Sequence, residues 1–260
     1  MTIMEKKTSI LFITNSFGDD TIEHMPMIAE SLGLNMDVFN LFYPGCSIDQ
    51  HIDYLVNDKP EYDFRYYENG EWKTKSKVTS RPYIKQRKWD YIVLQQASHF
   101  SGAKNGLNNL DKLVALIKEN LIDKNTKFIW NITWAYQSNT WHPAFKDTYR
   151  SSKEFMYNGI LQNVKDNIIN NPSFDKIFPI GIAVQCLSDV IGEEYLYRDT
   201  FHMSQNIGRF LSGLVAIKTV FDVDLTKNKY RPEGVDENMY SKLIRAVSVA
   251  LNILEKMKGE

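Results

Sequence analysis

Short apolar runs alternate with helical patterns along most of the chain. The runs are rich in β-branched and aromatic residues, and the stretches between them carry apolar residues three to four positions apart. The runs predict buried strands, and the spaced stretches predict amphipathic helices. Strand and helix alternate five times, which predicts an α/β fold with a five-stranded parallel sheet and helices on both faces. The predicted strands lie within residues 9–14, 35–42, 89–94, 127–134 and 175–185.

The segment from about residue 58 to residue 88 interrupts this alternation. Its aromatic residues surround Asn69-Gly70, a strong signal for a two-residue hairpin turn. We therefore expect an inserted β-hairpin beside the core. The last predicted element is an amphipathic helix over about 237–257, and residues 1–260 form a single predicted domain. A monomer is expected, with a homodimer through the last helix as the alternative.

Composition narrows the classes of protein. The chain has 260 residues, 43% of them hydrophobic, with 31 Lys and Arg against 32 Asp and Glu. This balance, without a basic block, argues against a nucleic-acid partner. The amino-terminal residues lack the apolar region of a signal peptide, and no apolar run is long enough for a membrane span. The chain as given is therefore expected to be cytoplasmic and not inserted in a membrane; a secreted or periplasmic protein that has lost its leader is the alternative.

Residues suited to a metal or a cofactor are scattered. Cys46 and Cys186 are the two cysteines, which is too few for a disulfide scaffold or a cysteine metal cluster. The five histidines lack a metal-ligand spacing, and no glycine-rich phosphate loop is present. We expect neither a metal nor a cofactor.

A serine follows the first predicted strand directly. Ser16 lies between the apolar run of residues 9–14 and a helical pattern. Residues at the carboxyl ends of parallel strands face the binding crevice of such sheets, and this is where a nucleophile would lie. The alternative is that Asn15 and Ser16 only cap the helix.

A second stretch favours the nucleophile. Asp199 and His202 are three residues apart before a predicted helix. A serine needs a base to take its proton, and a carboxylate orients a histidine base. Together with Ser16, the two residues predict a Ser-His-Asp triad.

Four short sequence motifs occur in the same order as in the SGNH (GDSL-like) hydrolases, which the chain resembles. The resemblance is closest to a bacterial branch of that superfamily. The motifs are Asn15-Ser16-Phe17, Gly45, Gln95-Gln96 and Asp199-x-x-His202, and the resemblance spans Ser9 to Val220. It implies a flavodoxin-like three-layer α/β/α fold and an oxyanion site made by the N–H groups of Ser16 and Gly45. Gln96, or Gln95, would replace the asparagine of the third motif. Thr14 departs from the family, which has a glycine there.

Aromatic residues follow the predicted fourth strand. Trp134, Tyr136 and Trp141 come after its carboxyl end and are candidates for a substrate wall, although simple packing is an equal alternative. His99 is a further candidate for substrate contact, or else a structural donor.

These features predict an SGNH-type esterase. The resemblance implies a small-molecule or glycan ester as substrate, with a short acyl group such as acetyl on a carbohydrate. A lipase or thioesterase acting on another acyl substrate, and a non-catalytic carbohydrate-binding relative, are the alternatives.

Overall fold

A mixed sheet of seven strands forms the centre of the protein. The computed structural model describes residues 7–259. The strand order is β4-β3-β2-β1-β5-β6-β7. The strands are β1 (Thr8–Thr14), β2 (Met36–Phe42), β3 (Tyr62–Glu68), β4 (Glu71–Val78), β5 (Tyr91–Leu94), β6 (Lys127–Asn131) and β7 (Phe174–Phe178).

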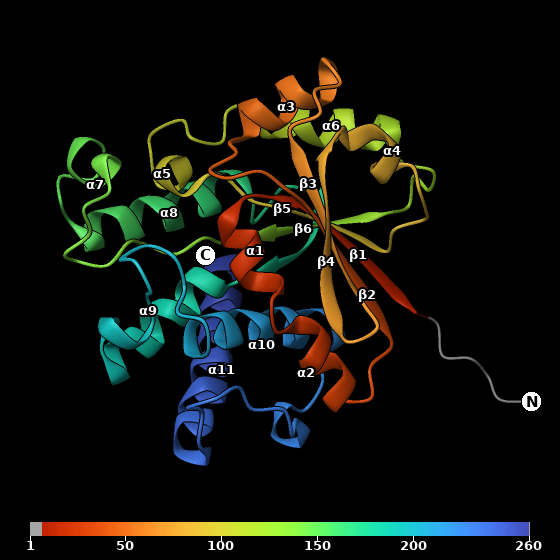
Figure 1. Ribbon diagram of the computed structural model, residues 1–260. Coiled ribbons are helices and arrows are strands. Elements are labelled where there is room, and N and C mark those ends of the chain that lie inside the picture. Colours follow the sequence, from red (N-terminus) through yellow and green to blue (C-terminus); the bar gives the residue numbers. More distant parts are fainter. Residues whose placement is uncertain (1–6, 260) are drawn as a thin grey trace, which may run out of the picture.

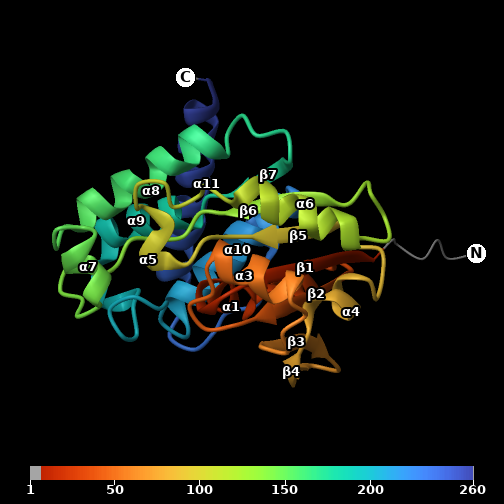
Figure 2. The same ribbon diagram turned by 90° about the horizontal axis from the view of Figure 1, so that it is seen from above.

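Helices cover both faces of this sheet (Figure 1). One group packs around α10, and another group packs around α6, so the sheet is the middle of three layers (Figure 2). The first group is α1 (Ser16–Ile22), α2 (Met25–Ser31), α9 (Ile180–Ile191), α10 (Ile207–Phe221) and α11 (Glu237–Gly259). The second group is α3 (Ile48–Val56), α4 (Ser80–Ile84) and α6 (Leu110–Asn120). The remaining helices are α5 (Ser98–Ser101), α7 (Pro143–Asp147), α8 (Lys153–Asn167) and the short 3-10 helices at Glu193–Tyr195 and Leu225–Lys227.

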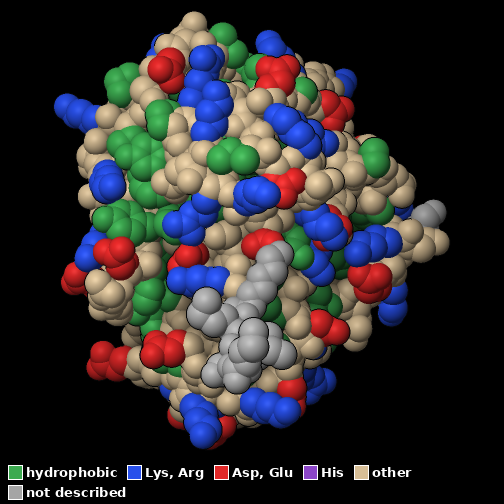
Figure 3. Space-filling model, turned by 90° about the vertical axis from the view of Figure 1, so that its right-hand side faces the viewer, with side chains coloured by type: hydrophobic (Ala, Val, Ile, Leu, Met, Phe, Trp, Pro, Cys, Tyr) green, Lys and Arg blue, Asp and Glu red, His purple; other side chains and the backbone are tan. Residues whose placement is uncertain are grey.

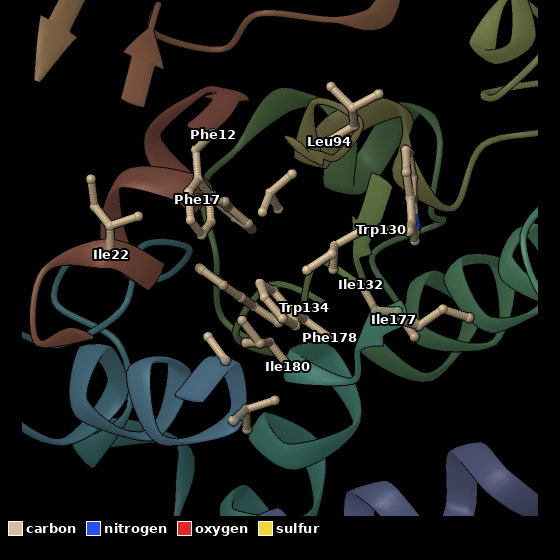
Figure 4. Close-up of a cluster of buried hydrophobic side chains, with 14 of the residues drawn as sticks. Phe12, Phe17, Ile22, Leu94, Trp130, Ile132, Trp134, Ile177, Phe178 and Ile180 are labelled. Carbon is tan, nitrogen blue, oxygen red and sulfur yellow. The ribbon is translucent and has the colours of Figure 1, made fainter. Parts of the chain in front are cut away.

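The apolar run of β1 explains its central place. Six of its seven residues are buried, so both faces of the strand need covering. β1 pairs in parallel with β2 on one side and with β5 on the other. The carboxyl ends of these strands meet at one edge of the sheet, which is where α1 begins. Side chains from β1, β6 and β7 with the adjacent helices form the buried cluster of Figure 4.

The inserted hairpin extends the sheet instead of lying beside it. β3 pairs antiparallel with β2, and β4 pairs antiparallel with β3. The turn is Asn69-Gly70, with φ of 54° and 86°, as a type I′ turn requires. The five predicted strands pair in parallel in the order β2-β1-β5-β6-β7, and the hairpin adds two antiparallel strands at the free edge of β2, so the complete sheet is mixed and has seven strands.

The fifth predicted strand is shorter than expected. Only residues 174–178 are extended, and the apolar residues that follow Pro179 form the first turns of α9. Proline cannot continue the ladder because it has no N–H. The first turns of α9 are buried throughout, and a short apolar run in a buried helix cannot be told from a buried strand by its pattern.

The amino ends of the parallel strands β2, β1, β5, β6 and β7 lie on the side shown in Figure 3. Lys and Arg side chains are interspersed with Asp and Glu side chains on the part of this face that is drawn in colour. Lys7 and Arg87, for example, both pair with Asp37. Such a mixture is typical of a solvent-facing surface.

His51 on α3 provides a pH-dependent contribution to stability. Its side chain is buried, its Nδ1 lies 2.7 Å from the Tyr62 hydroxyl, and burial lowers its pKa to about 3. The unfolded chain binds this proton near pH 6.5, so between the two values the unfolded state holds more protons. This contribution to stability is full above about pH 6.5 and is lost as the pH falls.

We expect His51→Asn to reduce the acid sensitivity of folding. For the native protein, the His51 contribution to the free energy of unfolding falls by about 2 kcal/mol between neutral pH and pH 5. Denaturant titrations of both proteins at the two pH values measure the difference. Identical pH dependence in the two proteins would contradict the assignment.

Candidate active site

Ser16 is the first residue of α1 and is separated from β1 by Asn15 alone. The side chain of Asn15 accepts a hydrogen bond from the Phe17 N–H at 3.1 Å and so caps the helix. The ring of Phe17 stacks on Trp134, with ring centroids 4.0 Å apart. The cap and the stacked ring fix the start of α1, and Ser16 is left half-buried with its hydroxyl available.

The structure brings Ser16, His202 and Asp199 together. The Ser16 hydroxyl lies 2.8 Å from Nε2 of His202, and Nδ1 of His202 lies 2.7 Å from Oδ2 of Asp199. The other carboxylate oxygen of Asp199 accepts the His202 N–H at 2.8 Å. One carboxylate thus orients both the loop and the ring. This is the order of contacts that a serine nucleophile, a histidine base and an orienting carboxylate require.

The environment of Asp199 favours its charged form. Partial burial alone would raise the pKa of this carboxyl, but hydrogen bonds from the His202 ring and from the N–H groups of His202 and Phe201 outweigh it. The pKa of Asp199 is therefore lowered. An ionised Asp199 keeps a proton on Nδ1 of His202 and leaves Nε2 free to accept one from Ser16.

A buried carboxylate joins the helix of Ser16 to the loop of His202. Asp20 is fully buried and accepts hydrogen bonds at 2.8 Å from both Arg198 and Arg209. Its second oxygen accepts the Met203 N–H at 2.9 Å. Sequence reasoning missed Asp20. Its position one helical turn after Ser16 could have drawn attention to it, but nothing in the sequence shows that it is buried.

The opposite side of the same loop is tied to the segment after β6. Thr200 has φ of 76°, which is rare for a β-branched residue. Its carbonyl accepts the Gln137 N–H at 2.8 Å, and its hydroxyl lies 2.8 Å from that of Thr140. Such a backbone conformation persists only where its surroundings hold it. Here it lies between the two loop residues of the triad.

Gly45 lies in a tight turn near the start of α1. Its φ is 63°, and the Cys46 N–H closes the turn onto the carbonyl of Tyr43 at 3.2 Å. Pro44-Gly45 at the centre of the turn is typical of type II. The Asn15 amide donates to the carbonyl of Cys46 at 2.9 Å and so links the turn to the helix cap. Within residues 7–259 the N–H groups of Ser16 and Gly45 have no hydrogen-bond acceptor.

Comparison with known proteins identifies the family. The family model described as "Domain of unknown function (DUF4886)" matches residues 9–250. The chain belongs to the DUF4886 family. A DUF4886 family protein from Bacteroides uniformis has a similar structure, with a TM-score of 0.88, 32% identity and 95% of each chain covered. A search of the curated proteins finds no match.

More distant structures share the fold of this DUF4886 protein. A candidate SGNH hydrolase from Slackia heliotrinireducens has a TM-score of 0.53 at 18% identity, covering 82% of this chain and 99% of that one. A catalytic mutant of an acetylxylan esterase from Geobacillus stearothermophilus has a TM-score of 0.50 at 10% identity, covering 85% and 98%. The predicted resemblance to SGNH hydrolases is therefore confirmed at the level of the fold.

The structure places both glutamines of the third motif in other interactions. The Gln96 carbonyl accepts the N–H groups of Ile48 and Ala97, and its amide donates to the carbonyl of Gly106. Gln95 donates to Asn15 at 2.6 Å. Each amide therefore fastens loops together. These contacts do not test the oxyanion role of Gln96, or of Gln95, which stays a prediction.

The four predicted substrate contacts separate into two groups. Trp134 and Tyr136 have no exposed surface, so their rings pack in the core and cannot form a substrate wall in this structure. Trp141 is 70% exposed, and its ring lies 5.5 Å from that of Phe201, the neighbour of His202. His99 is half-buried. Trp141 and His99 are left as the candidates.

Neither a metal-binding cluster nor a membrane-spanning helix is found in residues 7–259. Among residues 7–259, no group of three or more His, Cys, Asp or Glu side chains is arranged to hold a metal ion. The helices of the same range include none that could cross a membrane.

Proposed function

We propose that this DUF4886 protein is a serine hydrolase that cleaves an O-acyl ester. The observation that carries the proposal is the position of His202, which contacts the Ser16 hydroxyl through one ring nitrogen and Asp199 through the other. Of the chemistries weighed from the sequence, acyl transfer is the one that uses all three groups in this order.

In the proposed mechanism, His202 Nε2 takes the proton of Ser16 while Oγ attacks the carbonyl carbon of the ester. The negative charge that develops on the carbonyl oxygen is stabilised by the N–H groups of Ser16 and Gly45. His202 then gives its proton to the leaving alcohol, and an acyl-serine remains. Water then loses a proton to His202 and attacks the acyl carbon. As the bond between the acyl carbon and Ser16 Oγ breaks and the carboxylic acid leaves, His202 returns this proton to Ser16 Oγ. Asp199 stabilises the imidazolium in both halves.

A short acyl group on a carbohydrate is the proposed substrate. Trp141 offers an exposed ring close to the triad, and such a ring can stack on a sugar. Carbohydrate esterases are among the distant proteins that share the fold. A purely binding role would leave the three hydrogen-bonded groups without a use.

Two assays test the proposal. The native protein is expected to release p-nitrophenol from p-nitrophenyl acetate and acetate from acetylated xylan. A fluorophosphonate probe, which reacts with activated serines, is expected to label Ser16, as peptide mass spectrometry can show. Absence of both hydrolysis and labelling would overturn the proposal.

A further inference from the structure

A cavity lies away from Ser16 and His202, between the segment that follows α5 and the outer side of α8. Its volume is about 610 Å³, which is within the range of small-molecule sites. α5 and α8 lie side by side in both ribbon views (Figures 1 and 2). We call it the α5–α8 groove and define it by the residues Asn105, Asn108, Phe155, Gln162, Asp166 and Asn167.

The floor of the groove is backbone. A Cβ on Gly159 would lie 2.4 Å from the carbonyl oxygen of Gly102, so α8 and the segment after α5 touch without side chains between them. Asn163 fastens this contact, because its amide donates to the carbonyls of Ser101 and Ala103. The groove is therefore a pre-formed part of the fold.

The walls carry amide groups and one exposed ring. Among the described residues, the side chains of Asn105 and Asn108 make no hydrogen bond, and both are exposed. The side-chain amide of Gln162 donates to Asp166 and keeps its carbonyl oxygen available. Phe155 is 43% exposed at the edge, and the guanidinium group of Arg150 lies over its ring, 4.7 Å from the ring centroid. The charged lining residues, Lys104 and Asp166, have opposite signs.

We propose that the α5–α8 groove binds a neutral oligosaccharide. Amide groups donate and accept hydrogen bonds, as the hydroxyl groups of a sugar do. A half-exposed aromatic ring offers a face for the apolar side of a pyranose. An extended peptide is a poorer match, because the groove lies between a helix and a loop and offers no strand edge to pair with.

A row of rings connects this groove to the triad. Phe201 lies next to His202, its ring is 5.3 Å from that of His142, and His142 is 6.1 Å from His99. The Tyr149 hydroxyl donates to the carbonyl of His99 and accepts the Gly102 N–H. Gly102 also lines the groove. Phe201, His142 and His99 are partly exposed, whereas Tyr149 is buried and only anchors the segment that leads to the groove. We infer that a glycan with its ester at Ser16 passes over the three exposed rings toward the groove, and this part of the inference rests on the proposed function.

The groove is tested with Phe155→Ala and Gln162→Ala. A glycan array of neutral oligosaccharides is expected to show binding by the native protein and loss of that binding in both variants. With acetylated xylan as substrate, KM is expected to rise about tenfold in Phe155→Ala, while hydrolysis of p-nitrophenyl acetate stays unchanged. The matched controls are Asn158→Ala, an exposed amide on α8 outside the groove lining, and Ile122→Ala, an exposed apolar residue elsewhere.

The outcomes separate the two proposals. The proposal that the groove binds a glycan would be overturned if the native protein bound no neutral glycan. It would also be overturned if the native protein and both groove variants bound glycans equally well. The native protein could bind glycans through the groove and yet hydrolyse neither p-nitrophenyl acetate nor acetylated xylan. This result would support glycan binding in the groove and contradict the proposed esterase activity. Thermal unfolding of each variant shows whether a loss of binding reflects a loss of folding.

Discussion

Replacement of Ser16 by alanine is expected to lower kcat for ester hydrolysis by about 10⁴-fold or more. The variant keeps the N–H of residue 16 but has no nucleophile and no proton for His202 to take. His202→Ala should cause a loss of similar size, and the double variant should lose little more, because the two residues act as one unit. Initial rates with p-nitrophenyl acetate measure these losses.

The fold of the Ser16 variant should remain intact. Ser16 is half-buried, and its removal deletes one oxygen at the end of a helix that Asn15 still caps. The matched control is Ser241→Ala on α11, where the hydroxyl only donates to the carbonyl of Glu237. Activity of Ser16→Ala within the range of this control would show that hydrolysis occurs elsewhere.

The triad could be predicted because its signals are local. Ser16 follows a strongly apolar strand, and Asp199 and His202 share one loop three residues apart. Their mutual contact depended on the order of the strands, which the family resemblance supplied. The distances agree with that expectation.

Properties that depend on three-dimensional packing could not be predicted from the sequence. Gln96 and Gln95 have the donors that an oxyanion needs, but which partner an amide selects depends on neighbours distant in the sequence. Trp134 was placed correctly after a strand end, yet stacking on Phe17 buries it completely. The residues after Pro179 are buried as predicted, but in a helix instead of a strand.

The burial of Asp20 is a further property that could not be predicted from the sequence. An acidic residue in the first turns of a helix is ordinarily explained by the helix dipole and an exposed surface. Its partners Arg198 and Arg209 are 178 and 189 residues away. Since a carboxylate without partners would not be buried, the need for the two arginines follows from the fold and not from any local pattern.

Asp20→Asn is expected to destabilise the protein by about 3–5 kcal/mol, because it leaves the guanidinium groups of Arg198 and Arg209 without their buried counter-charge. Denaturant unfolding measures this loss. The control is Asp222→Asn, which removes an exposed ion pair with Lys218 and should change stability by no more than about 1 kcal/mol. Equal stability of the two variants would contradict the stabilising role of buried Asp20.

The hydrogen bonds of Asp20 with Arg198, Arg209 and the Met203 N–H, which we call the Asp20 clamp, should also position His202. A milder variant distinguishes this positioning role from the contribution of the clamp to stability. Arg198 is partly exposed, and Arg198→Gln leaves the pair of Asp20 with Arg209 in place. We expect a smaller loss of stability than in Asp20→Asn, together with lower kcat, slower labelling of Ser16 by a fluorophosphonate and a shifted pH profile of kcat. These readouts depend on the contact between His202 and Ser16, and a residue that only stabilised the fold would leave them unchanged while the protein is folded. Unchanged kinetics in folded Arg198→Gln would limit the clamp to a structural role.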